Sequence, residues 1–314
     1  MYHSSEGGAC GARGSLPHGQ PVYHSSSERA SVRGGDGNMP MVICRHGERT
    51  DYVTPGWTAA AARPWDPPLT PKGHEQAVLA GRQILNHLKR LHLPPIQQVF
   101  SSPLLRCAST AVQIAGQLGP ALDVKIEPNL VETICENWYY SWAIPGADGT
   151  WGGPGGSQAP KEHFEDAALR AQATASAATL YLGPAELSSV SSVIDSGYRA
   201  RSDLAAYRWG QYETEDQTAR RVADFGAAQA AAHPGSTVLL VTHGGPSSLT
   251  VEHLTGVAEG TVPVVGYTGL HVLAEPAAAG GSWRALVTGD VSHLGDDPGA
   301  LGASTAGRAT VAKL

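Results

Sequence analysis

The sequence has little of what marks membrane, secreted or nucleic-acid-binding proteins. No apolar run approaches the about 20 residues that span a bilayer, and the first residues lack the apolar segment of a secretory signal. Charged residues make up only 16% of the 314 residues, the net charge is −6, and Lys and Arg form no block that would favour binding to a phosphate backbone. We therefore expect a soluble, cytoplasmic protein that binds neither nucleic acid nor a membrane.

Cysteine is scarce, and its spacing indicates neither a disulfide framework nor a metal site. The scattered His and Asp residues also show no metal-ligand spacing. The glycine-rich stretch 152–156 lacks the Lys-Ser/Thr of a phosphate-binding P-loop, and no Gly-x-Ser-x-Gly motif is present. We expect no metal, no cofactor, and free thiols at the four cysteines, Cys10, Cys44, Cys107 and Cys135.

Length and patterning predict one large α/β domain with additions. Residues 1–38 are rich in Ser, Gly, His and Arg without a hydrophobic period, which is typical of a disordered extension. The folded domain is expected over 39–294. It is interrupted by a weakly patterned insertion at about 137–214, and a flexible tail follows over 295–314.

Hydrophobic periodicity predicts alternating strands and helices, and hence a three-layer αβα fold around a mostly parallel sheet. Thr70-Pro71 and Ser102-Pro103 each provide an N-cap followed by proline at the first helical position. His87 is expected on a solvated helix face. Strands are expected at 40–45, 96–100, 124–127 and 237–242, helices at 71–91, 103–118 and 215–232, and a final hairpin from 262–274 and 282–288.

The candidate binding and catalytic residues lie at the ends of these strands. Residues 45–49 read Arg-His-Gly-Glu-Arg, Arg106 lies in the first turn of the second helix, and His243 follows the strand at 237–242. Ligands bind at the carboxyl ends of strands in open α/β sheets. Arginines and a helix N-terminus favour an anion such as phosphate, and Glu132 follows another strand and is expected at the same edge.

These motifs resemble, in order and spacing from about residue 40 to 294, the histidine phosphatase superfamily, also called the phosphoglycerate-mutase-like family. Within it, the likeness is greatest to the phosphatase domain of ubiquitin-associated and SH3 domain-containing proteins. That finer likeness rests on Arg49, the Ser-Pro-Leu-Leu-Arg-Cys string, Asp195-Ser196-Gly197-Tyr198 and His293-Leu294. The family motifs lie at 45–49, 69–73, 101–107, 127–132 and 241–244.

The resemblance implies a role for each matching residue. His46 would attack phosphorus as a neutral imidazole and form a phosphohistidine, and Glu132 would act as general acid and then as general base. No metal would be needed, because cationic side chains offset the charge on the phosphoryl oxygens. These oxygens would be held by Arg45, Arg49, Arg106 and His243.

The expected activity is therefore metal-independent phosphomonoester hydrolysis. The substrate would be a phosphorylated small molecule or a phosphoprotein, and a homodimer is the oligomeric state that the resemblance suggests. A protein that binds phosphorylated ligands without turnover is the alternative. A mutase is disfavoured, because residues 132–136 read Glu-Thr-Ile-Cys-Glu where the glycolytic mutases carry Glu-Arg-His-Tyr-Gly.

Two site residues have competing interpretations. Arg49 could instead form a salt bridge with Glu48 or Asp51, which would satisfy its charge locally. Glu136 lies on the same loop as Glu132 and is an alternative acid.

Overall fold

The structure is a computed structural model that describes residues 39–63, 66–120, 122–133, 182–201, 213–276 and 281–295. The predicted extension over 1–38, most of the predicted insertion and nearly all of the predicted tail lie outside these ranges. Within the described part of the chain, no helix has both the length and the apolar character needed to cross a membrane.

The described residues form a six-stranded sheet in the order β3-β2-β4-β1-β5-β6. The strands β1, β4, β2 and β3 are parallel neighbours, whereas β5 and β6 add an antiparallel edge. The prediction of a mostly parallel sheet is confirmed. The strands are β1 (Met41–Arg45), β2 (Ile96–Ser101), β3 (Val124–Ile126), β4 (Thr237–Thr242), β5 (Leu270–Ala274) and β6 (Arg284–Asp290).

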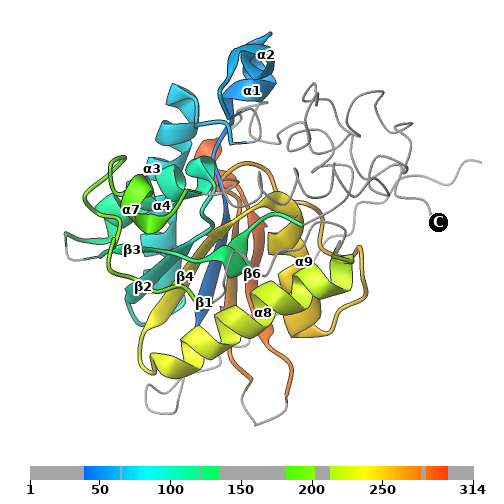
Figure 1. The fold of residues 1–314 in the computed structure, drawn as a ribbon. Coiled ribbons are helices and arrows are strands. Elements are labelled where there is room, and N and C mark those ends of the chain that lie inside the picture. The colour runs from blue at the N-terminus through cyan, green and yellow to red at the C-terminus, as the bar shows by residue number, and fades with distance from the viewer. Residues whose placement is uncertain are drawn as a thin grey trace, which may run out of the picture. The chain divides into compact units, whose positions relative to one another are not determined.

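Helices cover both faces of this sheet, with α3 and α4 on one face and α8 and α9 on the other (Figure 1). The long helices are α3 (Pro71–Arg90), α4 (Leu105–Leu118), α8 (Glu215–Ala232) and α9 (Gly244–Thr255). The short ones are α1 (Thr50–Val53), α2 (Trp57–Ala60), α7 (Pro184–Leu187), and the 3-10 turns η1 (Pro128–Leu130) and η5 (Ser292–Leu294).

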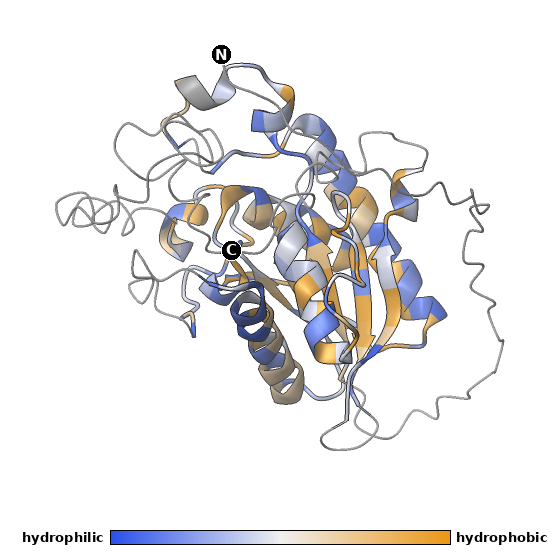
Figure 2. Ribbon diagram, turned by 90° about the vertical axis from the view of Figure 1, so that its right-hand side faces the viewer, coloured by the Kyte–Doolittle hydropathy of each residue, from blue (hydrophilic) through white to orange (hydrophobic). Residues whose placement is uncertain are grey.

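Alternation along the central strands explains why the sheet is covered twice. In β1, Val42 and Cys44 join the core under α3 and α4, while Met41 and Ile43 join the core under α8 and α9. A strand that is buried on both faces needs apolar side chains on both, and its sequence is therefore a continuous hydrophobic run. Figure 2 accordingly shows the strands as the hydrophobic centre of the molecule.

Local sequence signals define the start of α3 but not the start of α4. Thr70 caps α3 as predicted: its Oγ1 accepts a hydrogen bond from the Gly73 N–H at 2.9 Å. The predicted cap at Ser102 is wrong, because α4 begins at Leu105 and the carboxylate of Asp66 accepts the Leu105 N–H at 2.6 Å. The Ser102 hydroxyl accepts only the Leu104 N–H, before the helix, at 3.4 Å, and it bonds a histidine ring of the site at 2.9 Å.

Two further expectations need correction. Residues 262–269 form no strand: the chain turns at 267–268, where Thr268 adopts a positive φ of 52° and Gly269 N–H bonds back to Gly266 O, so the hairpin begins at Leu270. His87 is buried rather than solvated: its Nε2 lies 2.6 Å from the Asp290 carboxylate, on the face of α3 that packs against η5.

Candidate active site

The carboxyl end of β1 presents Arg45 and His46 beside the end of β4. The Arg45 guanidinium donates to the Val265 carbonyl at 2.6 Å and lies 4.6 Å from the centre of the Tyr267 ring. The His46 N–H donates to the Thr242 carbonyl at 3.0 Å, which continues the pairing of β1 with β4. The backbone therefore fixes both residues, in addition to their side-chain contacts.

The chain passes very close to the N-terminus of α3 directly after His46, which requires a glycine at position 47. A Cβ atom at Gly47 would lie 2.5 Å from the Gly73 carbonyl oxygen, at the start of α3, so no other residue fits without backbone movement. The Gly47 N–H also donates to the Thr110 hydroxyl at 3.0 Å. The turn is thus held between the N-terminus of α3 and the body of α4.

The ring of His46 is held as one neutral tautomer. Its Nδ1 lies 2.8 Å from the Gly47 carbonyl, and because a carbonyl only accepts, Nδ1 carries the proton and Nε2 has a lone pair. Burial lowers the pKa of His46 well below its usual 6.5, and the charges of Arg106 and Arg45 lower it further. His46 is therefore a neutral imidazole with an unprotonated Nε2 near neutral pH.

His243, directly after β4, is held as the opposite tautomer. The Arg106 guanidinium faces its Nδ1 at 3.3 Å, and arginine only donates, so Nε2 carries the proton and donates to the Ser102 hydroxyl at 2.9 Å. Burial and then Arg106 lower the pKa of His243 well below 6.5. Its ring centre lies 5.3 Å from that of His46, so the structure brings the two predicted histidines together.

Arg106 places a fully buried cation in the first turn of α4, against His243. Burial lowers the pKa of its guanidinium, and the charge of Arg49 lowers it further. Neither effect removes the charge at neutral pH, because arginine starts from 12.5.

Arg49 is paired with a carboxylate, as one of its two interpretations proposed. Its Nε donates to Asp51 Oδ1 at 2.9 Å and its guanidinium also reaches Oδ2 at 2.5 Å, while the Tyr52 ring lies 4.5 Å away. Arg49 nevertheless belongs to the cationic cluster, because its charge acts on both His46 and His243. The Asp51 pair and a place beside the site are thus compatible.

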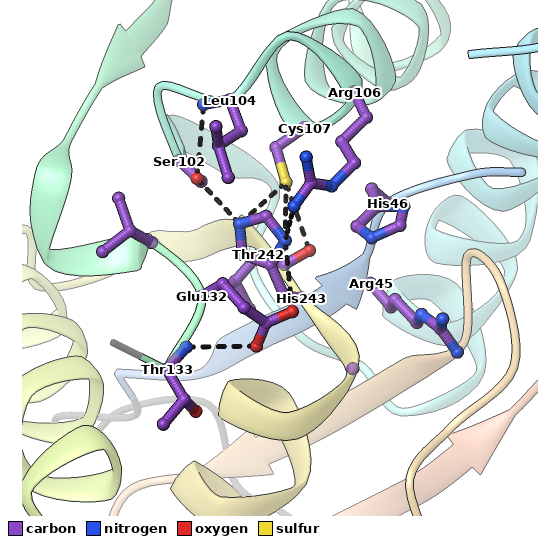
Figure 3. A network of polar contacts seen from close by, with 12 residues as sticks. Arg45, His46, Ser102, Leu104, Arg106, Cys107, Glu132, Thr133, Thr242 and His243 are labelled. Atoms are coloured by element: carbon purple, nitrogen blue, oxygen red, sulfur yellow. Dashed lines mark hydrogen bonds and ion pairs between the residues drawn. The ribbon is translucent and has the colours of Figure 1, made fainter. Parts of the chain in front are cut away.

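Glu132 reaches the site from the segment after η1. Its Oε2 lies 3.7 Å from His243 Nδ1, and its side chain keeps 25% of its surface exposed. Because His243 is neutral, this is a polar contact and not an ion pair. Figure 3 shows the Glu132 carboxylate, His243 and Arg106 converging, with His46 and Arg45 beside them. The alternative acid, Glu136, lies outside the described residues.

The described residues contain no cluster of three or more His, Cys, Asp or Glu side chains suited to a metal ion. Of the four cysteines, Cys44 and Cys107 are free and buried, and Cys107 Sγ lies 3.4 Å from His243 Nε2. Sequence reasoning missed Tyr267 and Asp66. Tyr267 packs against the Arg45 guanidinium, and Asp66 binds the first residue of α4, the helix that carries Arg106. Neither residue lies in a motif or a periodic run, so no local signal distinguishes it from an ordinary loop residue.

Comparison with known proteins identifies the family. The model of the histidine phosphatase superfamily (branch 1) matches residues 41–181 and 192–284, well over half of the chain. The chain therefore belongs to this superfamily, and the prediction of the family is confirmed.

One curated sequence and one solved structure, both from Bombyx mori, illustrate the similarity. The ecdysteroid-phosphate phosphatase of Bombyx mori is 33% identical over 132 residues, which cover 41% of this chain and only 17% of that protein. This chain thus matches a small part of its curated relative. The solved structure of the ecdysone phosphate phosphatase from Bombyx mori, in complex with tungstate, superposes with a TM-score of 0.53 at 19% identity, covering 79% of this chain and 92% of the other. That likeness confirms the phosphoglycerate-mutase-like fold.

Proposed function

We propose that this protein hydrolyses phosphomonoesters through a phosphohistidine formed on His46. The observation that carries the proposal is the state of the His46 ring. The Gly47 carbonyl holds the proton on Nδ1, and burial among arginines keeps the ring neutral, so Nε2 is a nucleophile inside a cationic pocket. Cations repel imidazolium but attract a phosphate dianion, so the same charges that keep His46 reactive also attract its target.

In the first step, the Nε2 lone pair of His46 forms a bond to phosphorus while the bond from phosphorus to the leaving oxygen breaks. The leaving oxygen takes its electron pair and receives a proton from the Glu132 carboxyl group, so a neutral alcohol departs. The exposed part of Glu132 is consistent with contact with an incoming substrate.

In the second step, water attacks the phosphorus of the phosphohistidine. The nitrogen–phosphorus bond breaks and its electron pair returns to His46 Nε2, while Glu132 takes the proton of the attacking water. Inorganic phosphate leaves, and Glu132 is again protonated for the next cycle.

The guanidinium groups of Arg45, Arg49 and Arg106, together with His243, would hold the phosphoryl oxygens in both steps. Donors fixed in place before the reaction stabilise developing charge strongly in a water-poor site, because they need not reorganise. In this scheme, the arginines supply the positive charge that a metal ion supplies in other phosphoryl-transfer enzymes.

For the substrate, we propose a phosphorylated small molecule, as the name of the Bombyx mori relative suggests. A phosphoprotein is the alternative implied by the likeness to the phosphatase domain of ubiquitin-associated and SH3 domain-containing proteins. That finer likeness, the expected homodimer and the cytoplasmic location stay predictions.

The test compares wild-type protein with His46→Ala on 4-nitrophenyl phosphate. We expect the variant to lose at least about 10³-fold in kcat/KM, because removal of a nucleophile abolishes the covalent route. Wild-type protein quenched during turnover should carry acid-labile phosphate on His46. His253→Ala, an exposed histidine on α9, is the matched control and should keep full activity.

Equal activity in wild type and His46→Ala would contradict the proposal. Binding of inorganic phosphate without hydrolysis of any monoester would instead favour the protein that binds phosphorylated ligands without turnover.

A further inference from the structure

We propose that Arg221, on α8 and outside the family motifs, is a positioning residue that sets the place of the Glu132 carboxyl group. The inference rests on the proposed function, in which Glu132 protonates the leaving group. It concerns how this chain holds a general acid whose own side chain has few contacts among the residues that the structure describes.

Arg221 binds the backbone that carries Glu132. Its Nη1 donates to the Asn129 carbonyl at 2.6 Å and to the Val131 carbonyl at 3.3 Å. Its Nη2 lies 3.3 Å from the Val131 carbonyl and 3.5 Å from the Glu132 carbonyl itself. One guanidinium therefore contacts three carbonyl groups within four consecutive residues.

Glu213 orients this guanidinium. Its Oε1 accepts from Arg221 Nε at 2.5 Å and its Oε2 accepts from Arg221 Nη2 at 2.7 Å. The Thr218 hydroxyl donates to the same Oε2 at 3.1 Å. The two side chains of the pair keep only 12% and 15% of their surface exposed. A paired fork of this kind is specific to arginine, since lysine presents a single point charge.

The same segment is held from two other sides. The Thr242 hydroxyl, at the end of β4, donates to the Leu130 carbonyl at 2.7 Å. The buried Glu127 carboxylate accepts from both the backbone and the side-chain N–H groups of Asn129. Carbonyls 129 to 132 are thus all bound, three by Arg221 and one by Thr242, so the backbone at Glu132 is fixed.

The Glu132 side chain is held much less firmly. Among the described residues, its carboxylate accepts one hydrogen bond, from the adjacent Thr133 N–H at 3.1 Å, and faces His243 at 3.7 Å. Its position therefore depends mainly on where the backbone places it. A shift of that backbone by about 1 Å is enough to weaken proton transfer strongly, so losing Arg221 should impair the acid while leaving His46 and the arginines in place.

The experiment compares two esters whose leaving groups differ in their need for a proton, so that it measures the contribution of the general acid alone. Values of kcat/KM are measured for an alkyl phosphate, whose alkoxide must be protonated as it leaves, and for 2,4-dinitrophenyl phosphate, whose phenolate leaves without a proton. We expect Arg221→Ala to lower kcat/KM for the alkyl ester on the order of 10-fold to 100-fold, within the usual contribution of a general acid. The dinitrophenyl ester should change by less than about 3-fold.

Arg220→Ala is the matched control. Arg220 is the preceding residue of α8, its side chain is 62% exposed, and it pairs with Asp216 one helical turn earlier. We expect this variant to hydrolyse both esters at the wild-type rate.

A double variant shows whether Arg221 acts through Glu132. Glu132→Gln should show the same selective loss, and adding Arg221→Ala to it should cause little further loss, because interacting residues are not additive. An equal loss on both esters, or fully additive losses, would overturn the inference. If Arg221→Ala does not fold, Arg221→Lys and Glu213→Gln test the inference instead. The measurement is again the ratio of kcat/KM for the alkyl ester to kcat/KM for the dinitrophenyl ester. If wild-type protein hydrolyses neither ester, the proposed function fails instead.

Discussion

The two histidines of the site differ in which nitrogen carries the proton, although both are neutral and buried. A backbone carbonyl at 2.8 Å sets the tautomer of His46, and a guanidinium at 3.3 Å sets that of His243. The tautomer of His46 is fixed because the carbonyl can only accept a hydrogen bond, and that of His243 is fixed because the guanidinium can only donate one. For His243, the hydroxyl of Ser102 completes the arrangement by accepting the remaining N–H.

This arrangement predicts a specific effect of Ser102→Ala. The substitution removes the hydroxyl that accepts the buried Nε2–H of His243 and the Leu104 N–H, and leaves only the weak acceptor Cys107 Sγ near Nε2, so we expect the free energy of unfolding to fall by about 1–3 kcal/mol. We also expect kcat/KM to fall by about 10-fold, because the ring can rotate or change tautomer. Urea unfolding and steady-state kinetics measure the two effects.

Ser101→Ala is the control for this variant. Its hydroxyl is equally buried but donates only to the Ser102 carbonyl, at 2.9 Å, so activity should stay close to wild type. The same loss of activity in both variants would show that packing in this turn, and not the tautomer of His243, is what matters.

Among the elements, the turn after β1 and the start of α3 fit together with almost no space between them. Gly47 approaches the Gly73 carbonyl, and a Cβ at Gly73 would lie even closer to the carbonyl oxygen of Glu48 and 2.9 Å from its nitrogen. The obstructing atoms belong to the backbone, so they cannot move aside as a flexible side chain does.

Gly73→Ala should therefore separate the turn from α3. We expect a loss of about 1–3 kcal/mol in the free energy of unfolding, as for other overpacked sites, together with a clear loss of activity, because the displaced turn connects His46 to Arg49. Gly116→Ala in α4 is the matched control: it is exposed, its new Cβ meets nothing within 4 Å, and it should stabilise the protein by up to about 1 kcal/mol. Equal effects in thermal melts would contradict this account.

Sequence patterns predicted those elements whose signals are local. Thr70 and Pro71 mark the start of α3 because a cap and its helix lie within four residues, and the strand ends at Arg45 and Thr242 follow from continuous apolar runs. The site residues on those strand ends could be grouped because parallel strands share an edge.

The errors occurred where a distant partner outweighed a local signal. Ser102 is followed by Pro103, a typical start of a helix, but its hydroxyl binds His243, which lies 141 residues away in the sequence. His87 lies on a helix face that reads as solvated, yet Asp290, 203 residues further on, buries it. Arg221 shows no sequence signal, because its role depends on carbonyl groups about 90 residues earlier in the chain.

Across the described part of the chain, burial keeps several histidines neutral. It lowers the pKa of His271 to about 4, and it lowers that of the partly buried His293 to about 4 although the Asp290 carboxylate opposes the shift. Burial and the arginines lower the pKa of His46 and His243 well below 6.5. In the unfolded chain, these side chains bind protons at about pH 6.5.

Stability should therefore decrease in mild acid. Between about pH 6.5 and pH 4 the unfolded state binds more protons than the folded state, so the free energy of unfolding falls as pH falls. Urea unfolding at pH 7.5 and pH 5 should show this loss, and His271→Gln should show a smaller loss than wild type. A protein equally stable at both pH values would contradict this prediction.

The pairing of β1 with β4 has a consequence for how the distance between His46 and His243 responds to mutation. Arg45 is in register with Thr242, and the two imidazoles belong to the residues that directly follow the two strands. Their separation of 5.3 Å is close to the roughly 4.8 Å between neighbouring strands. The distance between them is thus inherited from main-chain geometry, so exchanges of apolar volume beneath the sheet leave it nearly constant, whereas a slip of one strand by a single residue destroys it.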